Sequence, residues 1–348
     1  GFDRIRGLLL ERCLSPLGRS QVDTIHFSTD PEFLSHELDL VEEMRLLLLF
    51  AQGFPAQNYF DLRSATDQLR IKGNWMEVEM LGELRAVLAT IHGILAFFLE
   101  ANPGKYPRLG ALAGEVVLDQ GILVELDRVL DDQGGIRDNA SEKLREVRRQ
   151  LGRLQTLAEQ AVKRTMELAR RSGWVPDDTD ISVRNGRVVI PVHASAKKKL
   201  DGFIHDRSAT GQTLFIEPRE VFETNNEIRE LELEEAEEIR RILIALADMI
   251  RPEIPALQEA FAFLGRIDFL RAKGKLALEL DAHKPLLRDE AYIEWFDAFH
   301  PLLLLSHKAQ GKKVVPLKVR VDAAQRILII SGPNAGGKSV ALKTIGLL

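Results

Sequence analysis

The sequence predicts a mainly α-helical protein with a small β domain between two long helices and a different, sheet-containing domain at its end. Three observations lead to this fold class. Of the 348 residues, 45% are hydrophobic, 28% are charged and only 6% are aromatic, a composition typical of helix-rich globular proteins. Residues 137–171 contain no proline and place apolar side chains every three or four positions, which indicates a helix that pairs with another helix. Between residues 181 and 190 the period shortens and β-branched residues accumulate, which favours strands.

Composition and length limit the classes of protein to consider. The chain has 47 Lys and Arg against 52 Asp and Glu, so its net charge is 47 − 52 = −5. The single cysteine, Cys13, excludes an internal disulfide, and no apolar run approaches the roughly 20 residues that cross a bilayer. We therefore expect a cytoplasmic protein of two or three domains with no membrane partner. The chain starts at Gly1 without Met and stops within an apolar run, so we expect it to be a piece of a longer protein.

Residues 1–135 are expected to form a helical core without catalytic chemistry. Asp30-Pro31 is a helix start, because Pro fits the first turn, and Gly53 ends that helix. Another long helix is predicted over residues 77–100, where Asn102-Pro103-Gly104 stops it.

Two helices are expected to form an antiparallel arm. The outgoing helix lies in residues 136–172 and would be about 50 Å long. The returning helix starts near Asn225, in a segment (223–284) that leads back to the core. The outgoing helix carries several arginines, and we interpret them as salt-bridge partners of the acids at 230–238 rather than as ligands of nucleic acid. These arginines are Arg145, Arg148, Arg149 and Arg153.

A small β domain is predicted at the tip of the arm, over residues 173–222. Asn185-Gly186 between β-branched runs is a strong hairpin signal. Between residues 184 and 211 six basic residues face two acids, a net charge of +4 in an acidic protein, which favours contact with nucleic-acid phosphates over a merely solvated turn. The candidate phosphate ligands are Lys197, Lys198, Lys199, Arg184, Arg187 and Arg207. His193 and His205 lack further ligands at metal spacing, so no zinc site is expected.

The motif with the clearest chemistry lies in the last segment, residues 285–348. Val319-Arg320-Val321 and Ile327–Ile330 are predicted strands, and the second is followed by G-x-x-x-x-G-K-S. Such a loop cradles phosphates with backbone N–H groups, its lysine binds the β and γ phosphates, and its serine coordinates Mg²⁺, so the predicted cofactors are ATP and Mg²⁺. Only nine residues follow Ser339, too few for a Walker-B carboxylate, so we expect no ATPase activity from this chain alone. The motif residues are Gly332, Pro333, Asn334, Ala335, Gly336, Gly337, Lys338 and Ser339.

Two stretches of the sequence resemble a known family. The loop 332–340, with Leu342-Lys343-Thr344-Ile345-Gly346 behind it, is similar to the P-loop of MutS-type ATPases. The stretch from Val189 to Pro218, followed by Asn225-Asn226, resembles the clamp of the bacterial MutS paralogues that carry a C-terminal Smr nuclease and lack a mismatch-recognition domain. Phe299 stands before His300-Pro301 where this family usually has Arg, and Ser339 stands where it often has Thr.

The resemblance implies a fold and a function. The fold would be a MutS-type helical core, a two-helix lever arm with a β clamp at its tip, and the start of an α/β P-loop ATPase domain. The full protein would be a homodimeric ATPase that opens and closes around DNA or a ribosome with its rRNA, in suppression of recombination through branched DNA, a form of DNA repair, or in rescue of collided ribosomes. Its Smr endonuclease would lie beyond Leu348.

Two rival interpretations differ in class. Chromosome-maintenance ATPases place their P-loop before the coiled coil, whereas this chain places it after the arm. A structural coiled-coil scaffold or protein-docking element, with a vestigial nucleotide site, stays open. The sequence does not separate branched DNA from ribosomes, because both present phosphate backbones.

Overall fold

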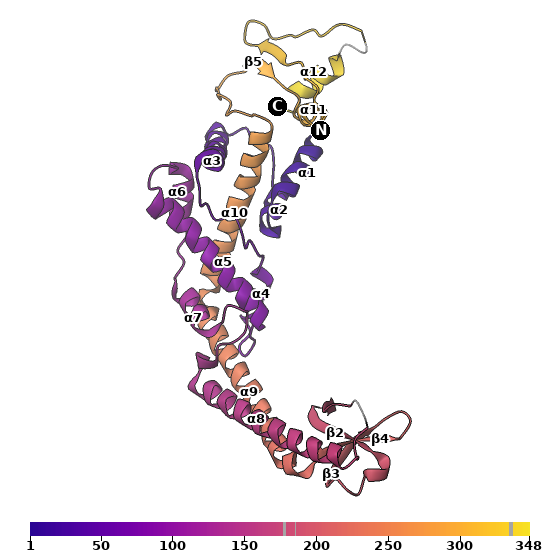
Figure 1. Ribbon diagram of the computed structural model, residues 1–348. Helices are drawn as coiled ribbons and strands as arrows, with labels where there is room; N and C mark the ends of the chain where they lie inside the picture. The colour runs from indigo at the N-terminus through magenta and orange to yellow at the C-terminus, as the bar shows by residue number, and fades with distance from the viewer. Residues whose placement is uncertain (177–178, 185, 334–336) are drawn as a thin grey trace. The chain divides into compact units, whose positions relative to one another are not determined.

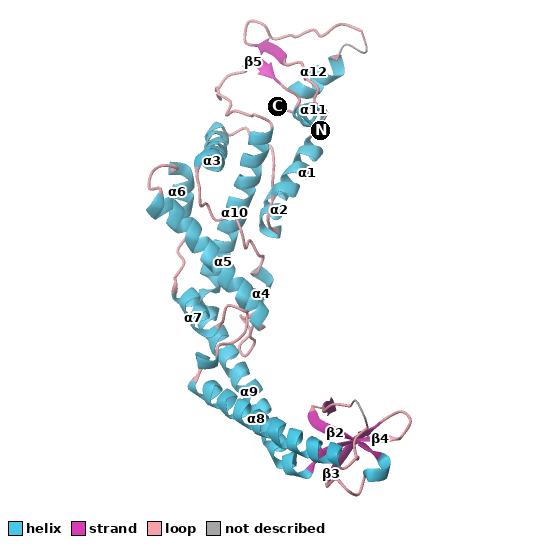
Figure 2. Ribbon diagram, viewed as in Figure 1, coloured by secondary structure: helices cyan, strands magenta, loops and turns pink. Residues whose placement is uncertain are grey.

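Helices dominate the chain, and they fall into two compact units. The computed structural model describes residues 1–176, 179–184, 186–333 and 337–348. One unit, here called the helical unit, comprises residues 1–74, 79–124 and 249–348; the other, here called the arm unit, comprises residues 75–78 and 125–248. Strands in the described residues form a four-stranded and a two-stranded sheet (Figure 2). The prediction of a mainly α fold with a small β region is confirmed.

The helical unit is built around one long helix, α10 (Ile254–Glu279). Figure 1 shows α10 with α1 and α2 on one side and α3 on the other, and all three contact it. Most of its side chains are buried, including Phe261, Leu264 and Ile267, because neighbours pack on nearly all of its faces. The other helices of this unit's core are α1 (Phe2–Arg12), α2 (Pro16–Asp23), α3 (Pro31–Phe50), α4 (Arg63–Gln68), α5 (Val78–Ala96) and α6 (Pro107–Gly114).

Capping decides where two of these helices begin. Asp30 precedes α3, and its carboxylate accepts hydrogen bonds from the backbone N–H groups of Glu32 and Phe33, as its sequence predicts. Ser15 caps α2 and accepts a bond from the Gly18 N–H.

A buried carboxylate joins the start of α2 to α10. Asp268 is fully buried and accepts hydrogen bonds from the backbone N–H groups of Leu14 and Ser15 and from the Ser15 hydroxyl, each at 2.9 Å. A Cβ at Gly18 would lie 2.3 Å from the Asp268 carboxylate, so only glycine allows this approach. The charge of Asp268 is therefore satisfied inside the fold rather than directed to solvent.

One segment of the helical core has the length and composition of a membrane span. The stretch Val78–Ala101 meets both criteria, although 44% of its most apolar window is buried inside the structure. Leu84, Val87 and Ile91 on α5 are completely buried. Helices in the core of a fold have the same features, and we interpret α5 as a core helix.

Two long antiparallel helices form most of the arm unit. Helix α8 spans Glu142–Arg171 and α9 spans Arg219–Ile250, so the returning helix begins six residues earlier than the sequence indicates. Ser141 caps α8, accepting a hydrogen bond from the Leu144 N–H at 3.0 Å. Helix α9, like α7 (Gly121–Val129), contains residues of both units.

A four-stranded antiparallel sheet follows α8 in the arm unit (Figure 2). Its strands are β1 (Ser182–Arg184), β2 (Arg187–His193), β3 (Gly202–Arg207) and β4 (Thr213–Pro218), in the order β1-β2-β4-β3. One face packs on the end of α8, where Val162 and Met166 meet Ile190 and Ile216. The hairpin between β1 and β2 forms at the Asn-Gly site, although Asn185 itself lies outside the described residues.

The last part of the helical unit contains a second sheet. Strand β5 (Ile293–Ala298) pairs with β6 (Leu317–Val321), and α11 (Pro301–Ala309) and α12 (Lys338–Ile345) complete the segment. The predicted strand at 319–321 is confirmed within β6. The predicted strand at 327–330 is wrong for this structure: the segment has no strand partner among the described residues, and Ile327 and Ile329 are more than 80% exposed. An extended segment becomes a strand only when a neighbour satisfies its backbone groups.

Candidate functional site

The described part of the predicted phosphate-binding motif lies at the start of α12. Gly337 precedes this helix with φ of 86°, a left-handed conformation that glycine adopts without strain. The Lys338 ammonium group donates a hydrogen bond to the Gly332 carbonyl at 2.5 Å, so the lysine folds back over its own loop. Ser339 is exposed in the first turn of α12. Asn334, Ala335 and Gly336 lie outside the described residues.

A pocket of about 530 Å³ lies beside this motif in the helical unit. Gly337 and Thr344 line it from the α12 side, and His300 and His307 line it from the α11 side. The Nδ1 atoms of both histidines are buried and have no hydrogen-bond partner within the described segments. Such atoms are suited to a polar ligand, which would relieve the desolvation cost.

In its described part, the motif has no carboxylate that could hold Mg²⁺ opposite Ser339. Elsewhere in the described segments of the chain, no group of three His, Cys, Asp or Glu residues has the geometry of a metal site. The donors present, a serine hydroxyl and the lysine ammonium group at a helix start, fit the phosphates of a nucleotide that brings its own metal.

Three of the predicted phosphate ligands share one turn of the arm unit. Lys197, Lys198 and Lys199, here called the lysine turn, lie in the connection from β2 to β3 and are all exposed. The flanking residues Ala196 and Leu200 are buried in the core between the sheet and α8. The pattern Ala-Lys-Lys-Lys-Leu thus anchors both ends of the turn and directs the lysines outward. No carboxylate forms an ion pair with them among the residues that the structure describes.

The three predicted arginine ligands have different surroundings. Arg207 is exposed at the end of β3. Arg184 lies over the Phe215 ring, 4.3 Å from its centroid, with its Nε atom 3.4 Å from Asp206. Arg187 is directed inward, where its Nη1 donates to both carboxylate oxygens of Glu217 at 2.9 Å. The structure therefore gathers the lysines and exposes Arg207, whereas Arg187 has internal partners.

Sequence reasoning missed the role of Glu217. This residue is completely buried in β4 and also lies 2.6 Å from Nε2 of His205. The available signal was an acid beside the apolar run Leu214-Phe215-Ile216, because a buried carboxylate needs charged or polar partners.

The arginines of α8 behave largely as salt-bridge partners. Arg148 reaches across to Glu235 of α9 at 2.6 Å, as predicted, and Lys143 reaches Glu234 at 2.9 Å. Two others pair within α8 instead of across the arm, because an acid lies three residues before each. These are Arg145, with Glu142, and Arg149, with Glu146.

The remaining residues considered from the sequence have structural surroundings. Trp174 packs against the core of the arm unit, and His193 is a half-buried residue at the end of β2. Cys13 lies in the core of the helical unit, where burial raises the pKa of its thiol to about 11. Such a thiol is not a nucleophile at neutral pH.

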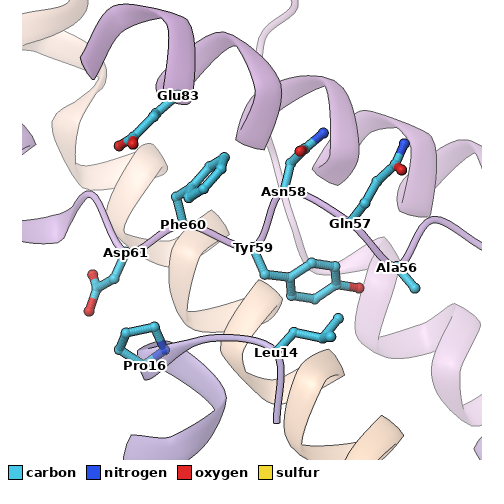
Figure 3. Close-up of a pocket in the computed structure, with 9 residues that line it drawn as sticks. All are labelled: Leu14, Pro16, Ala56, Gln57, Asn58, Tyr59, Phe60, Asp61 and Glu83. Atoms are coloured by element: carbon cyan, nitrogen blue, oxygen red, sulfur yellow. The ribbon is translucent and has the colours of Figure 1, made fainter. Parts of the chain in front are cut away.

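A further pocket, of about 480 Å³, lies on the helical unit (Figure 3). In Figure 3 the Glu83 and Asp61 carboxylates both lie to the left of Phe60, Glu83 above and Asp61 below, and Tyr59 and Leu14 lie lower in the view. Asp61 is already bound by Arg63 through two hydrogen bonds, of 2.9 and 2.7 Å. This pocket therefore lacks the convergent polar groups of a small-molecule site.

Comparison of the sequence with known proteins identifies similar proteins of one name. No family model matches the chain. It is 35% identical over 348 residues to a protein of Symbiobacterium thermophilum named endonuclease MutS2, covering 99% of the chain and 42% of that relative. Proteins with the same name from Geobacillus sp. (33% over 352 residues; 100% of the chain, 44% of the relative) and Carboxydothermus hydrogenoformans (39% over 251 residues; 72% and 31%) are also similar.

These sequence similarities place the chain in the class of MutS-type proteins. Within this class the chain belongs to the MutS2 family of MutS paralogues. It spans less than half of the length of the curated relatives that it matches.

Proposed function

We propose that this chain is part of an ATP-dependent, homodimeric MutS-type clamp that engages structured nucleic acid. The observation that carries the proposal is the lysine turn, whose three exposed ammonium groups lie in the small sheet domain of the arm unit. Phosphate binding requires local positive charge, and the lysine turn provides it although the chain as a whole has a net negative charge. Residues 173–222 would be the clamp, 136–172 and 223–284 the lever with its return to the core, and 1–135 the rest of the core.

Residues 285–348 would begin the ATPase domain. Gly332, Gly337 and the start of α12 would hold the phosphates, and Ser339 would reach the nucleotide-bound Mg²⁺. ATP would supply the free energy that opens or closes the clamp. In the complete protein the ATPase, the Smr nuclease and the partner subunit would complete the activity, in the cytoplasm.

Nucleotide binding can be tested with a matched pair of variants in the complete protein. Lys338→Ala should abolish binding of a fluorescent ATP analogue, because it removes the cation that faces the phosphates. Lys343→Ala, on the last turn of α12, removes the same charge away from the loop and should leave the affinity within about twofold. Equal affinities of both variants would contradict a phosphate-binding role for the motif.

The nature of the nucleic acid needs a direct comparison. The complete protein with ATP would be titrated with four-way-junction DNA, plain duplex and collided ribosome pairs at the same salt concentration. A preference for junctions would support suppression of recombination, and a preference for collided ribosomes would support ribosome rescue. Equal binding to plain duplex would contradict recognition of structured substrates.

A scaffold is the second candidate, favoured by apolar side chains on the arm. Leu157 and Leu168 on α8 and Leu233 on α9 are 47 to 60% exposed, and in a scaffold they would contact another protein. In that case, Lys338→Ala would retain function in cells although nucleotide binding is lost.

A further inference from the structure

One completely buried carboxylate connects three elements of the arm unit. Glu217, near the end of β4, has 0% exposure and is surrounded by donors from three other parts of the chain. Arg187 of β2 binds both of its oxygens at 2.9 Å, and His205 of β3 lies 2.6 Å away. Asn225 of α9 donates from its side-chain amide at 2.5 Å. A carboxylate bound by this many donors is held in one orientation.

Arg187 extends this network along the first turns of α9. Its Nη2 donates to the Asn226 side chain at 2.7 Å, and its guanidinium lies over the Phe222 ring, 5.4 Å from the centroid. Phe222 in turn contacts Phe203 of β3, with ring centroids 4.3 Å apart. The sheet and the start of α9 are therefore joined by the hydrogen bonds of Arg187 with Asn226 and of Asn225 with Glu217 and by the contact of the Phe203 and Phe222 rings, in addition to the covalent link between Pro218 and Arg219.

The network lies where the connection that carries the lysine turn rejoins the sheet. Gly202, three residues after Lys199, pairs with Pro218, and its neighbour Phe203 pairs with Glu217. The Arg219 N–H also donates to the Asp201 carbonyl at 3.1 Å. The end of the connection is thus fixed to the first residue of α9, and Glu217 holds the next turn of the same helix through Asn225.

We propose that Glu217 and Arg187 are positioning residues for the lysine turn: they lock the sheet onto α9 and contact no ligand themselves. This inference rests on the proposed function, because the lysine turn is taken as the phosphate contact. It gives Arg187 a role different from the direct phosphate contact that its charge alone suggests.

Charge-conserving substitution distinguishes these two roles of Arg187. Lysine keeps the charge but has only one nitrogen, so it cannot replace both Nη1, which contacts the two oxygens of Glu217, and Nη2, which reaches Asn226. As a positioning residue, Arg187→Lys should weaken nucleic-acid binding about tenfold, as much as Arg187→Gln does. As a direct phosphate ligand, Arg187→Lys would retain most of the affinity.

Salt dependence of the affinity gives a second distinction. Each phosphate contact adds about 0.9 to the slope of log Kobs against log salt on duplex DNA. Arg187→Gln should lower the affinity and leave this slope unchanged, because no phosphate contact is lost. A slope reduced by about one unit would overturn the inference.

Orientation of the sheet can be measured without any ligand. Spin labels at Ala209→Cys, in an exposed turn of the sheet, and Glu230→Cys, on an exposed face of α9, report their mutual distance within the arm unit. Cys13, the one cysteine of this chain, is buried and would not be labelled in the folded protein, and any cysteine elsewhere in the complete protein would first be replaced by serine. The parent should give a narrow distance distribution in the complete protein, whereas Glu217→Gln should broaden it.

Asn226→Ala is the milder variant if Glu217→Gln does not fold. It removes the α9 partner of Arg187 and leaves the buried ion pair intact, so it should broaden the distribution with an unchanged far-ultraviolet circular dichroism spectrum. Distributions as narrow as that of the parent in both variants would overturn the proposal. If Lys197→Gln, Lys198→Gln and Lys199→Gln together leave the affinity unchanged, the proposed function fails. The distance measurement needs no ligand, so it would still test whether Glu217 and Arg187 hold the sheet on α9.

Discussion

Single buried charged residues stabilise contacts between elements of this fold. Asp268 illustrates the principle, because its carboxylate is completely buried and bound by two backbone N–H groups and one hydroxyl at the start of α2. We expect Asp268→Ala to destabilise the helical unit by about 3 to 5 kcal/mol, since these buried donors lose their acceptor.

A matched surface variant controls this prediction. Arg70 and Asp67 form an exposed ion pair, each more than half exposed, so Arg70→Ala should cost less than about 1 kcal/mol. Urea unfolding followed by circular dichroism measures both free energies. Similar losses for the two variants would show that Asp268 does not hold α2 in place.

The lowered pKa of Glu238 leads us to predict that the stability of the fold depends on pH. Hydrogen bonds from Arg241 and Ser141 lower its pKa from 4.5 to about 2, against the opposing effect of burial. Because the pKa is lower in the folded state, this stabilisation is complete above about pH 4.5 and is lost as the pH falls towards 2. Glu238→Gln should therefore flatten the pH dependence of the unfolding free energy between pH 4.5 and 2. Curves of equal steepness for parent and variant would contradict this assignment.

At the scale of elements, the arm helices depend on pairs across their interface more than on pairs within one helix. Arg148 contacts Glu235 of α9, and both side chains are about three-quarters buried, whereas the pair of Arg149 with Glu146 lies on the surface of α8. Arg148→Ala should cost about 1 to 2 kcal/mol, and Arg149→Ala should cost clearly less, because solvent screens its exposed ion pair. Thermal unfolding of the two variants tests this order, and a larger loss for Arg149→Ala would contradict it.

The sheet depends on a close approach between β3 and β4. A Cβ at Gly202 would lie 2.2 Å from the Glu217 carbonyl oxygen, so Gly202→Ala should disrupt the pairing and destabilise the arm unit. A Cβ at Gly152, inside α8, would meet no atom within 4 Å, so Gly152→Ala should stabilise the arm unit by about 0.5 to 1 kcal/mol. Thermal unfolding of both variants measures the contrast, and the same sign for both would count against this account.

The sequence predicts an element well when neighbouring residues determine it, and poorly when residues far along the chain determine it. The helix start at Asp30 and the hairpin at Asn185-Gly186 follow from local chemistry, and both could be predicted. The strand expected at 327–330 could not be judged locally, since a strand requires a partner that no periodicity reveals. The partners of Arg187 were also beyond prediction, because they come from residues 30 and 39 positions away.

At the scale of the whole molecule, the proposed function depends on an uneven distribution of charge along the chain. The protein carries a net charge of −5, yet its three adjacent lysines are exposed and have no ion-pair partner in the parts of the chain that the structure describes. The phosphate-binding motif is predicted from the spacing of its residues alone, because the pattern is local, and its role stays a prediction. Binding by the lysine turn could only be suggested, because exposure of a basic run depends on what packs around it.

The most direct measurement is the affinity of the complete protein for structured nucleic acid, with ATP, at several salt concentrations. Two variants with the same loss of three positive charges are compared: Lys197, Lys198 and Lys199 changed to Gln, and Arg145, Arg149 and Arg153 on α8 changed to Gln. The account predicts that the lysine variant loses about 10- to 100-fold in affinity and up to about three units of salt slope, whereas the arginine variant stays close to the parent. Equal losses in both variants, or none in the lysine variant, would contradict the claim that the lysine turn binds the phosphates.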